Sequence, residues 1–513
     1  MQPSVFMIFS MRKIFALLVL LLMSLNSFAQ DSGSFMTAKT TKKVAGIPEN
    51  TLLSINGISY RLDPINSTLV WNINTAEYGT LTLESFNNKQ LPFVFYVDDI
   101  QGYWDRLIIK EVIPEYQNAA KLYADPYQYE LRRELESEAL QFVAWIRDNG
   151  MELNDPYLEN YLYSLVAKIS PKYLLDARTT NVNVIIIQDP SPSASCYPNG
   201  TLVINSGLLA TIHSEDELVA VLSHEIAHYV LDHHVRNINE IEKNRRRSQI
   251  FAGIATLATA VIEGVAAANG NNYMPGVATS AVAMMSSAAV TSVCEDLGME
   301  YNHEQEYQAD RVAFEILSIL GYKQEAMATA LSRIEHDFTA YKGASMYVSS
   351  DTHPSLNSRI KRLGVPNLDR DVEFEQIVSF AVSNAAMLRY GQGRFTQSLS
   401  IIDQNIENGV ATANDYVLKA KCLLALENSQ DAVNEILALL EIAKHIDSSN
   451  LDIYKTEILA ILRGGQMDVA IEKLTDYMLM LSEVSAMNSL TMLFVEQEIE
   501  WSKYMLIKLN AMS

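Results

Sequence analysis

The spacing of hydrophobic and polar residues changes several times along the chain, and each change predicts a different kind of structure. From Leu52 to Val97 apolar and polar positions alternate, with turn-forming pairs at Asn56-Gly57 and Asn87-Asn88. This pattern predicts a small antiparallel β module, preceded by a polar, flexible segment over residues 31–49. From Tyr127 to Asp148 the apolar residues recur at helical spacing, which predicts the first long helix.

Two apolar runs, Ile250–Ala268 and Val277–Cys294, are rich in small residues and are also predicted to be helical. Glu263 interrupts the first run, and serine and threonine dilute the second, which argues against membrane spans. The remaining alternatives are a buried helical hairpin and a hairpin that touches a membrane surface.

The chain from Phe374 onward is predicted to form consecutive helices with a weak internal repeat. Three similar segments place the small residues Ser398, Ala432 and Ala470 at equivalent positions, 34 and then 38 residues apart. This spacing is close to the tetratricopeptide period of 34. It predicts a tetratricopeptide-like array with a concave face for peptides, with an ordinary helical bundle as the alternative.

The first thirty residues have the parts of an export signal. Met11-Arg12-Lys13 gives a basic start, and Ile14–Met23 is an apolar core that is short for a transmembrane helix. Ser27-Phe28-Ala29 is a small-x-small cleavage site, so we expect cleavage after Ala29. The chain is therefore predicted to be exported to a periplasm; the alternative is a buried N-terminal helix.

Charge and composition narrow the class of partner. The net charge of -22 argues against binding to nucleic acid and to anionic membranes in general. With 513 residues and 49% hydrophobic content, two or three domains are expected. The 3 cysteines are far apart and odd in number, so they predict no disulfide framework.

The strongest chemical signal is the H-E-x-x-H motif at His224-Glu225-Ile226-Ala227-His228. Residues four apart share a helical face, so both imidazoles can reach one zinc ion. Glu225 can aim its carboxylate at a zinc-bound water, whose pKa the metal lowers. The motif predicts a zinc centre with Glu225 as general base; the alternative is an amphipathic helix that carries two histidines by chance.

A catalytic zinc needs a third protein ligand, and a later helical segment offers two carboxylates. Glu306 and Asp310 are four apart and share a face. Glu306 can complete a His-His-Glu site, and Asp310 can accept a hydrogen bond from the far nitrogen of a ligand histidine. The alternative is a solvated acidic face, since the chain has 61 acidic residues.

An ordered set of motifs from about Asp155 to Val365 resembles the CAAX-prenyl-endopeptidase, HtpX and BepA group of zinc metallopeptidases, family M48. Its parts, in chain order, are Val182–Ile187, Tyr197–Gly200, Leu202–Leu209, Glu215–Leu218, the H-E-x-x-H helix, Glu306 to Asp310, Thr352-His353-Pro354 and Arg359-Ile360. Other gluzincins also carry H-E-x-x-H with a later glutamate. The Glu-Tyr-Gln-Ala-Asp and Thr-His-Pro blocks point to this family.

The resemblance implies zinc ligands His224, His228 and Glu306, with Glu225 as general base and Asp310 holding a ligand histidine. It also implies that His353 and Arg359 lie near the metal. Either residue can stabilise the oxyanion of the tetrahedral intermediate. Alternatively, His353 acts as a reversible fourth ligand that blocks the water position.

The resemblance also implies a substrate-binding strand. It places the strand around Leu202 to Asn205 at the edge of a small sheet, where an extended peptide can add by backbone hydrogen bonding. The chain departs from the family in the preceding loop, where Ser193-Ala194 stands in place of the usual Asn-Ala. The apolar residues 250–294 correspond to the family's variable insertion, which can gate the cleft.

His233 and His234 follow the motif closely and are not predicted to be ligands. Because His233 is five residues from His228, its side chain turns off the shared face. Both are interpreted as helix-end residues that are favourable to the C-terminal dipole.

Together these features predict an α+β protein in four parts. They are a signal peptide (1–29), a small β-rich module (30–125), a mainly helical gluzincin-type metallopeptidase domain with a small β-sheet (126–370) and an all-α tetratricopeptide-like repeat domain (371–513). The predicted function is that of an exported endopeptidase with one Zn²⁺ per chain.

Protein substrates are expected, with misfolded envelope proteins as the class that the resemblance implies and a partner protein on the repeats. The competing hypothesis is a chaperone-like assembly scaffold whose peptidase site is closed by His353 or little used. A membrane-embedded prenyl-protein protease is disfavoured, because the chain lacks convincing spans.

Overall fold

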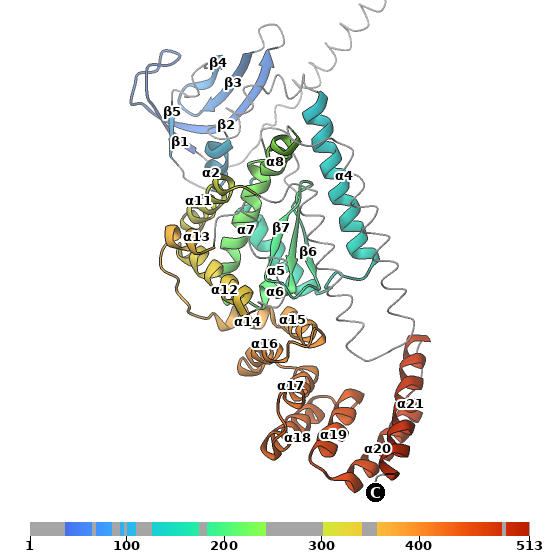
Figure 1. Cartoon of the computed structure of the whole chain (residues 1–513). Helices are drawn as coiled ribbons and strands as arrows, with labels where there is room; N and C mark the ends of the chain where they lie inside the picture. The colour runs from blue at the N-terminus through green and yellow to red at the C-terminus, as the bar shows by residue number, and fades with distance from the viewer. Residues whose placement is uncertain are drawn as a thin grey trace, which may run out of the picture. The chain divides into compact units, whose positions relative to one another are not determined.

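The computed structural model describes residues 36–63, 68–84, 93–96, 100–108, 126–172, 174, 182–242, 301–340, 356–484 and 489–511. These residues divide into two compact units (Figure 1). Unit 1 takes residues up to Arg132 together with 170–180, and unit 2 takes 133–169 and 181–513. The predicted signal peptide, the apolar runs of residues 250–294 and His353 lie outside the described residues.

Unit 1 contains the predicted antiparallel β module, a sheet in the order β4-β3-β2-β1-β5, followed by helix α2. Its elements are β1 (Met36–Thr40), β2 (Leu52–Asp63), β3 (Thr68–Thr75), β4 (Gly79–Glu84), β5 (Phe93–Tyr96) and α2 (Ile100–Leu107). The segment of residues 31–49 was predicted to be flexible, but its residues 36–40 form strand β1, which pairs with β2 and β5. Ala38 in this strand is buried. The predicted turn at Asn56-Gly57 was also wrong: it lies inside β2, where a bulge between Ile55 and Gly57 absorbs the extra residue.

The helix predicted over Tyr127–Asp148 is present as α4 (Pro126–Asp148), and its part from Arg133 onward belongs to unit 2. Unit 2 continues with α5 (Pro156–Ile169) and a second sheet. This sheet has the order β6-β8-β7, from β6 (Asn183–Ile187), β7 (Ala194–Cys196) and β8 (Thr201–Asn205). The expectation that Leu202–Asn205 forms an edge was wrong, because β8 pairs with both neighbours. A tight turn with Gly200 at φ 78° folds β7 back onto β8, so β7 is one of the two edge strands.

The H-E-x-x-H helix, α7 (Glu215–Val230), is contacted by α5 and by three later helices, α8 (His233–Glu242), α11 (His303–Leu320) and α12 (Ala326–Ala340). Helix α13 (Leu356–Leu363) packs on α11 and α12. Helix α7 packs directly against α11, α12 and β7, and it is buried along almost its whole length from Glu217 onward. Because neighbouring elements enclose α7, the few polar side chains on it are held in fixed directions.

The C-terminal part of unit 2 is all helical, as predicted, with consecutive helices packed against each other. Its helices are α14 (Val372–Ile377), α15 (Ser379–Gly391), α16 (Phe395–Glu407), α17 (Ala413–Leu426), α18 (Gln430–Ile446), α19 (Leu451–Arg463), α20 (Met467–Glu483) and α21 (Ser489–Asn510). Ser398, Ala432 and Ala470 are buried near the starts of α16, α18 and α20. The tetratricopeptide assignment itself stays a prediction. Among the described helices, none has the length and apolar content that crossing a bilayer requires.

Among the described glycines, Gly207 leaves the least room for a side chain. It lies in the short helix α6 (Ser206–Leu209), and its backbone nitrogen donates to the Asp189 carbonyl at 2.8 Å. A Cβ atom there would meet the Pro190 carbonyl oxygen at 2.2 Å, which is far inside van der Waals contact. The backbone of the loop of residues 188–193 therefore packs directly against Gly207, where no side chain fits.

We expect Gly207→Ala to lower the free energy of unfolding by about 1–3 kcal/mol, because the loop must move to admit the methyl group. Chemical denaturation of the full chain measures this. Gly464→Ala is the control, since its Cβ would lie 3.3 Å from Val433 Cγ1, which requires a shift of only a few tenths of an ångström. Equal stability of both variants would contradict the prediction.

Candidate metal centre

Helix α7 presents His224 and His228 on one buried face. The helix begins at Ser214, whose hydroxyl accepts a hydrogen bond from the Glu217 backbone nitrogen, and three acidic residues follow in the first turn. From this start the helical period brings the two imidazoles one turn apart. His224 is 5% exposed and His228 is 0% exposed, so both imidazoles can bind only groups in the interior of the protein.

Helix α11 brings Glu306 and Asp310 to the same place. It begins with a capping box between Asn302 and Gln305, and it ends at Gly321 in the left-handed conformation. Both carboxylates lie on its buried face, so the alternative of a solvated acidic face was wrong. Asp310 Oδ1 lies 3.0 Å from His224 Nδ1, which leaves His224 Nε2 directed at the other ligands.

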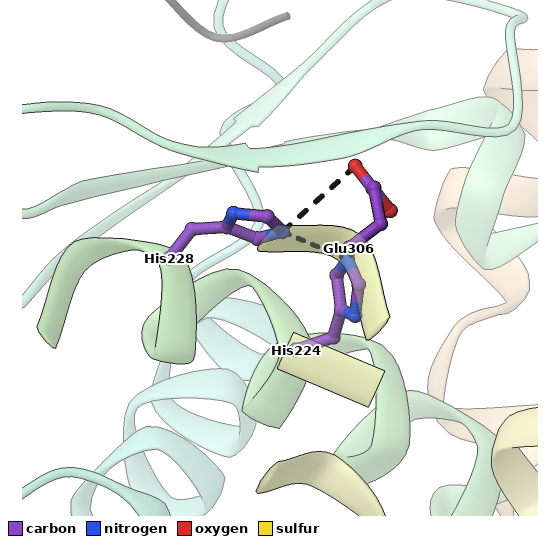
Figure 2. A group of neighbouring side chains, drawn as sticks. All are labelled: His224, His228 and Glu306. Carbon is purple, nitrogen blue, oxygen red and sulfur yellow. Dashed lines mark hydrogen bonds and ion pairs between the residues drawn. The ribbon is translucent and has the colours of Figure 1, made fainter. Parts of the chain in front are cut away.

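Figure 2 shows how His224, His228 and Glu306 converge. The His224 and His228 Nε2 atoms are 3.1 Å apart, and Glu306 oxygens lie 3.5 Å from His224 Nε2 and 4.0 Å from His228 Nε2. Ligand atoms about 2.0–2.1 Å from a tetrahedral ion are about 3.3 Å from one another. The three side chains therefore form a group that could hold one metal ion.

Arg359, from α13, is buried between the two carboxylates. Its Nη1 lies 2.7 Å from Glu306 Oε2, and its Nε and Nη2 bond the two oxygens of Asp310 at 2.8 and 2.6 Å. All three nitrogens are engaged with carboxylates in this arrangement. The structure thus brings Arg359 to the site as a residue that fixes Glu306 and Asp310, whereas His353 lies outside the described residues.

The interpretation of His233 and His234 as C-terminal helix-end residues was wrong. Helix α7 ends at Val230, and both histidines begin α8, where they are buried. Asp232 at φ 62° reverses the chain between the helices. As a result, His233 Nδ1 lies 2.8 Å from His228 Nδ1, and its Nε2 lies 3.0 Å from Gln308 Oε1.

His233 therefore does for His228 what Asp310 does for His224: it meets the ring nitrogen that faces away from the metal position. The sequence carried one signal for this role, the unusual pair of histidines just after the motif. Its neighbour His234 places Nε2 2.8 Å from the Cys196 carbonyl oxygen of β7. Tyr301 lies stacked on the His228 ring with centroids 3.6 Å apart.

Glu225 lies between α7 and the edge strand, and it is partly buried. The Cys196 backbone nitrogen donates to Glu225 Oε2 at 3.4 Å. Burial raises the pKa of Glu225 to about 7, with His224 opposing this and Glu306 adding to it. A carboxyl group with that pKa can take and return a proton near neutral pH.

The two α7 histidines have opposite protonation tendencies. Burial lowers the pKa of His224, but the hydrogen bonds to Asp310 and Glu306 outweigh burial and raise it to about 9. Burial, with His224 and His233 nearby, lowers the pKa of His228 well below its ordinary value. His228 is thus neutral and ready to ligate, while His224 must lose a proton first.

Comparison with known proteins agrees with this geometry. The family model described as Peptidase family M48 matches residues 156–366, a range that contains all three converging side chains. Residues 156–366 are therefore similar to the peptidase domain of family M48. The match ends within the chain, so the β module and all the helices from α14 onward lie outside it.

Two relatives resemble the chain over longer ranges. A Vibrio cholerae protein assigned as a beta-barrel assembly-enhancing protease is 29% identical over 43% of this chain and 41% of its own length. The beta-barrel assembly-enhancing protease of Escherichia coli strain K12 is 24% identical over 51% of this chain and 50% of its own length. The matches span about half or less of the length of these curated relatives.

A shorter match concerns a eukaryotic protein. The mitochondrial metalloendopeptidase OMA1 of Schizosaccharomyces pombe is 42% identical over 53 residues, which is 10% of this chain and 16% of that protein. The comparisons together support a metallopeptidase domain similar to that of the beta-barrel assembly-enhancing proteases.

We expect His233→Ala to weaken metal binding about 10–100-fold, because the His228 ring loses the contact that fixes its orientation. Competition with a zinc chelator measures the affinity, and the absorption spectrum of the Co²⁺-loaded protein reports the ligand geometry. His445→Ala, at an exposed position on α18, is the control and should bind as the parent does. An unchanged affinity in His233→Ala would rule out this positioning role.

We expect metal binding to strengthen as pH rises, because bound protons compete with the ion. Between pH 7 and 9 the protonated His224 must lose one proton, so affinity should rise about tenfold per pH unit. Below pH 7 the neutral Glu225 carboxyl adds a second proton and a steeper dependence. Calorimetry in buffers of different ionisation enthalpy counts the released protons; zero release at pH 8 would contradict the prediction.

Proposed function

We propose that this chain is a zinc-dependent endopeptidase that hydrolyses peptide bonds of protein substrates. The observation that carries the proposal is the convergence of His224, His228 and Glu306 with Glu225 beside them. Two imidazoles and one carboxylate at these separations suit tetrahedral Zn²⁺ with one open position. When bound, the metal polarises a carbonyl oxygen and lowers the pKa of a water molecule.

The chain's own residues hold and move the proton. Glu225 takes the proton from the attacking water and later passes it to the leaving amine. Asp310 and His233 orient the two imidazoles from behind, and Arg359 orients Glu306 and Asp310. Because the guanidinium is engaged with both carboxylates, oxyanion stabilisation falls to the metal and to His353 in this proposal.

The edge strand β7 is the proposed substrate-binding edge. The Ser193 carbonyl and the Tyr197 nitrogen form hydrogen bonds with β8 residues. Because backbone groups of successive strand residues point to opposite sides, those of Ala194 and Cys196 point away from β8. At Cys196 those groups meet Glu225 and His234. An extended substrate would pair with this edge and take the place of these contacts, which brings its carbonyl beside Glu225.

The physiological setting is proposed from the relatives. Two of them carry names that refer to beta-barrel assembly. We propose that the chain is exported, acts in envelope protein quality control on misassembled proteins, and uses its helical tail to recruit substrates or a partner. An exported location rests on the N-terminal sequence pattern alone.

A second candidate function is that of an assembly scaffold whose peptidase site is closed. The observation in its favour is that His224, His228 and Glu306 are all nearly inaccessible, at 5%, 0% and 5% exposure. Ligation by His353 would stabilise such a state without any change to the motif.

We expect Glu225→Gln to lower the cleavage of an unfolded protein by about 10²–10⁴-fold, because the amide cannot accept the proton. Glu304→Gln is the matched control on α11, exposed to solvent, and should cleave as the parent does. The measurement is proteolysis of casein by the zinc-loaded chain, with the bound zinc quantified for each variant.

His353→Ala separates the two roles of His353 in the same assay. Higher activity than the parent means that His353 blocks the metal, and lower activity means that it supports the transition state. Failure of the parent, Glu225→Gln and His353→Ala to cleave, although zinc is bound stoichiometrically, would contradict the endopeptidase and support the scaffold.

A further inference from the structure

A groove of about 790 Å³ lies within unit 2, away from the metal centre. Its floor comes from the tail helices α15, α17 and α19, and one wall comes from residues 152–154 and Gln188 of the metallopeptidase portion. This volume is in the range of pockets that bind ligands. The metal centre uses none of these residues.

The helices present regular faces to the groove. On α15 the lining residues Phe380, Ser383, Asn384 and Met387 follow the spacing i, i+3, i+4, i+7. On α17 the lining residues Asn414, Val417, Leu418 and Lys421 follow the same spacing. Each helix therefore gives the groove one continuous stripe. The stripe on α15 keeps large apolar side chains in solvent, with Phe380 51% and Met387 41% exposed.

Two buried polar atoms in the groove lack hydrogen-bond partners. Asn384 and Asn405 donate through Nδ2, to Gln188 and to Ser379 and Ser383 respectively. Their Oδ1 atoms accept nothing from the described residues, although Asn384 is only 7% exposed and Asn405 only 1%. A buried acceptor left unmade costs about 1–3 kcal/mol. Both oxygens have almost no accessible surface, so a ligand that donates N–H groups can satisfy them only when the asparagine side chains turn toward it.

The charged side chains that line the groove favour a ligand with positive charge. Glu152, Asp415 and Asp452 line the groove against one lining cation, Lys421, which pairs with Asp452 at 2.8 Å. Glu152 pairs with Arg147 at 3.2 Å, and Asp415 accepts a hydrogen bond from Ser383, so the carboxylates exceed the nearby cations by one. The surplus of carboxylates attracts a cation and disfavours an acidic ligand.

We propose that this groove binds an extended polypeptide segment that carries basic and apolar side chains. An extended backbone presents unpaired N–H groups to the Asn384 and Asn405 oxygens, whereas a helical ligand has already used its own. The apolar side chains pack on Phe380 and Met387, and the basic ones lie beside the carboxylates. The proposal rests on the proposed function only in taking the bound polypeptide to be a substrate or partner of the peptidase.

The test uses the full zinc-loaded chain with Glu225→Gln, so that no peptide is cleaved. The probe is a short fluorescein-labelled peptide of alternating leucine and arginine, and fluorescence anisotropy measures its binding. Two comparison peptides replace arginine by glutamate, or methylate the central backbone nitrogens. Phe380→Ala and Asp452→Lys remove an apolar contact and reverse a charge inside the groove.

Matched controls make the same changes outside the groove. Phe494→Ala truncates an exposed phenylalanine of α21, and Asp476→Lys reverses an exposed carboxylate of α20. We expect the two groove variants to weaken binding about tenfold or more and the two controls to leave it unchanged. The glutamate and N-methylated peptides should bind at least tenfold more weakly than the arginine peptide.

Several outcomes would contradict the proposal that this groove binds a polypeptide. They are failure of the arginine peptide to bind, equal binding of the glutamate peptide, equal binding of the N-methylated peptide, or equal losses in the control variants. Casein cleavage by the parent and by His353→Ala decides the proposed function separately. Cleavage without groove binding would reject the groove alone, and groove binding without cleavage by either protein would reject the peptidase alone.

Discussion

The buried ion cluster of Arg359 with Glu306 and Asp310 is the interaction on which the metal centre depends. Buried charges persist only when they neutralise each other. Without metal, a protonated His224 and Arg359 balance the two carboxylates, while Glu225 can stay neutral near pH 7. A divalent ion adds two positive charges, and the protons of His224 and Glu225 are the two that can leave. If the group holds a divalent ion, loss of these two protons would keep the net charge of the cluster constant.

A second buried cation joins the catalytic part of unit 2 to its helical tail. Arg389 of α15 is 1% exposed; it bonds both oxygens of Asp337 on α12 at 2.8 Å and donates to the Pro190 carbonyl at 3.0 Å. Loss of one partner from such a pair leaves a buried charge and costs about 3–5 kcal/mol. Because α12 packs on α7, the tail is anchored to the immediate neighbour of the helix that carries the ligand histidines. The tail is thus held by electrostatics as well as by apolar contact.

Features set by residues close in sequence were predictable, and chain reversals were not. The spacing of four residues placed His224 with His228 on one buried face, and the alternation of residues 52–97 predicted antiparallel strands. By contrast, the positive φ angle of Asp232 turns the chain so that His233 contacts His228. The turn at Gly200 places β7 at the end of the sheet, next to β8. Loops have no hydrophobic period, so no pattern reports such angles. The hairpin signal at Asn56-Gly57 failed because pairing continues on both sides of the bulge.

The loop of residues 188–193 relates the groove to the edge strand. Gln188 lines the groove, Pro190 is held by Arg389, and Ser193 pairs with β8 where β7 begins. The edge strand itself has only three residues, Ala194–Cys196, so few backbone bonds can hold a substrate there. A polypeptide held in the groove raises the effective concentration of its neighbouring segment at β7, which strengthens binding without a new contact at the metal. If one polypeptide occupies both the groove and the edge strand, the groove would add affinity that three strand residues alone do not supply.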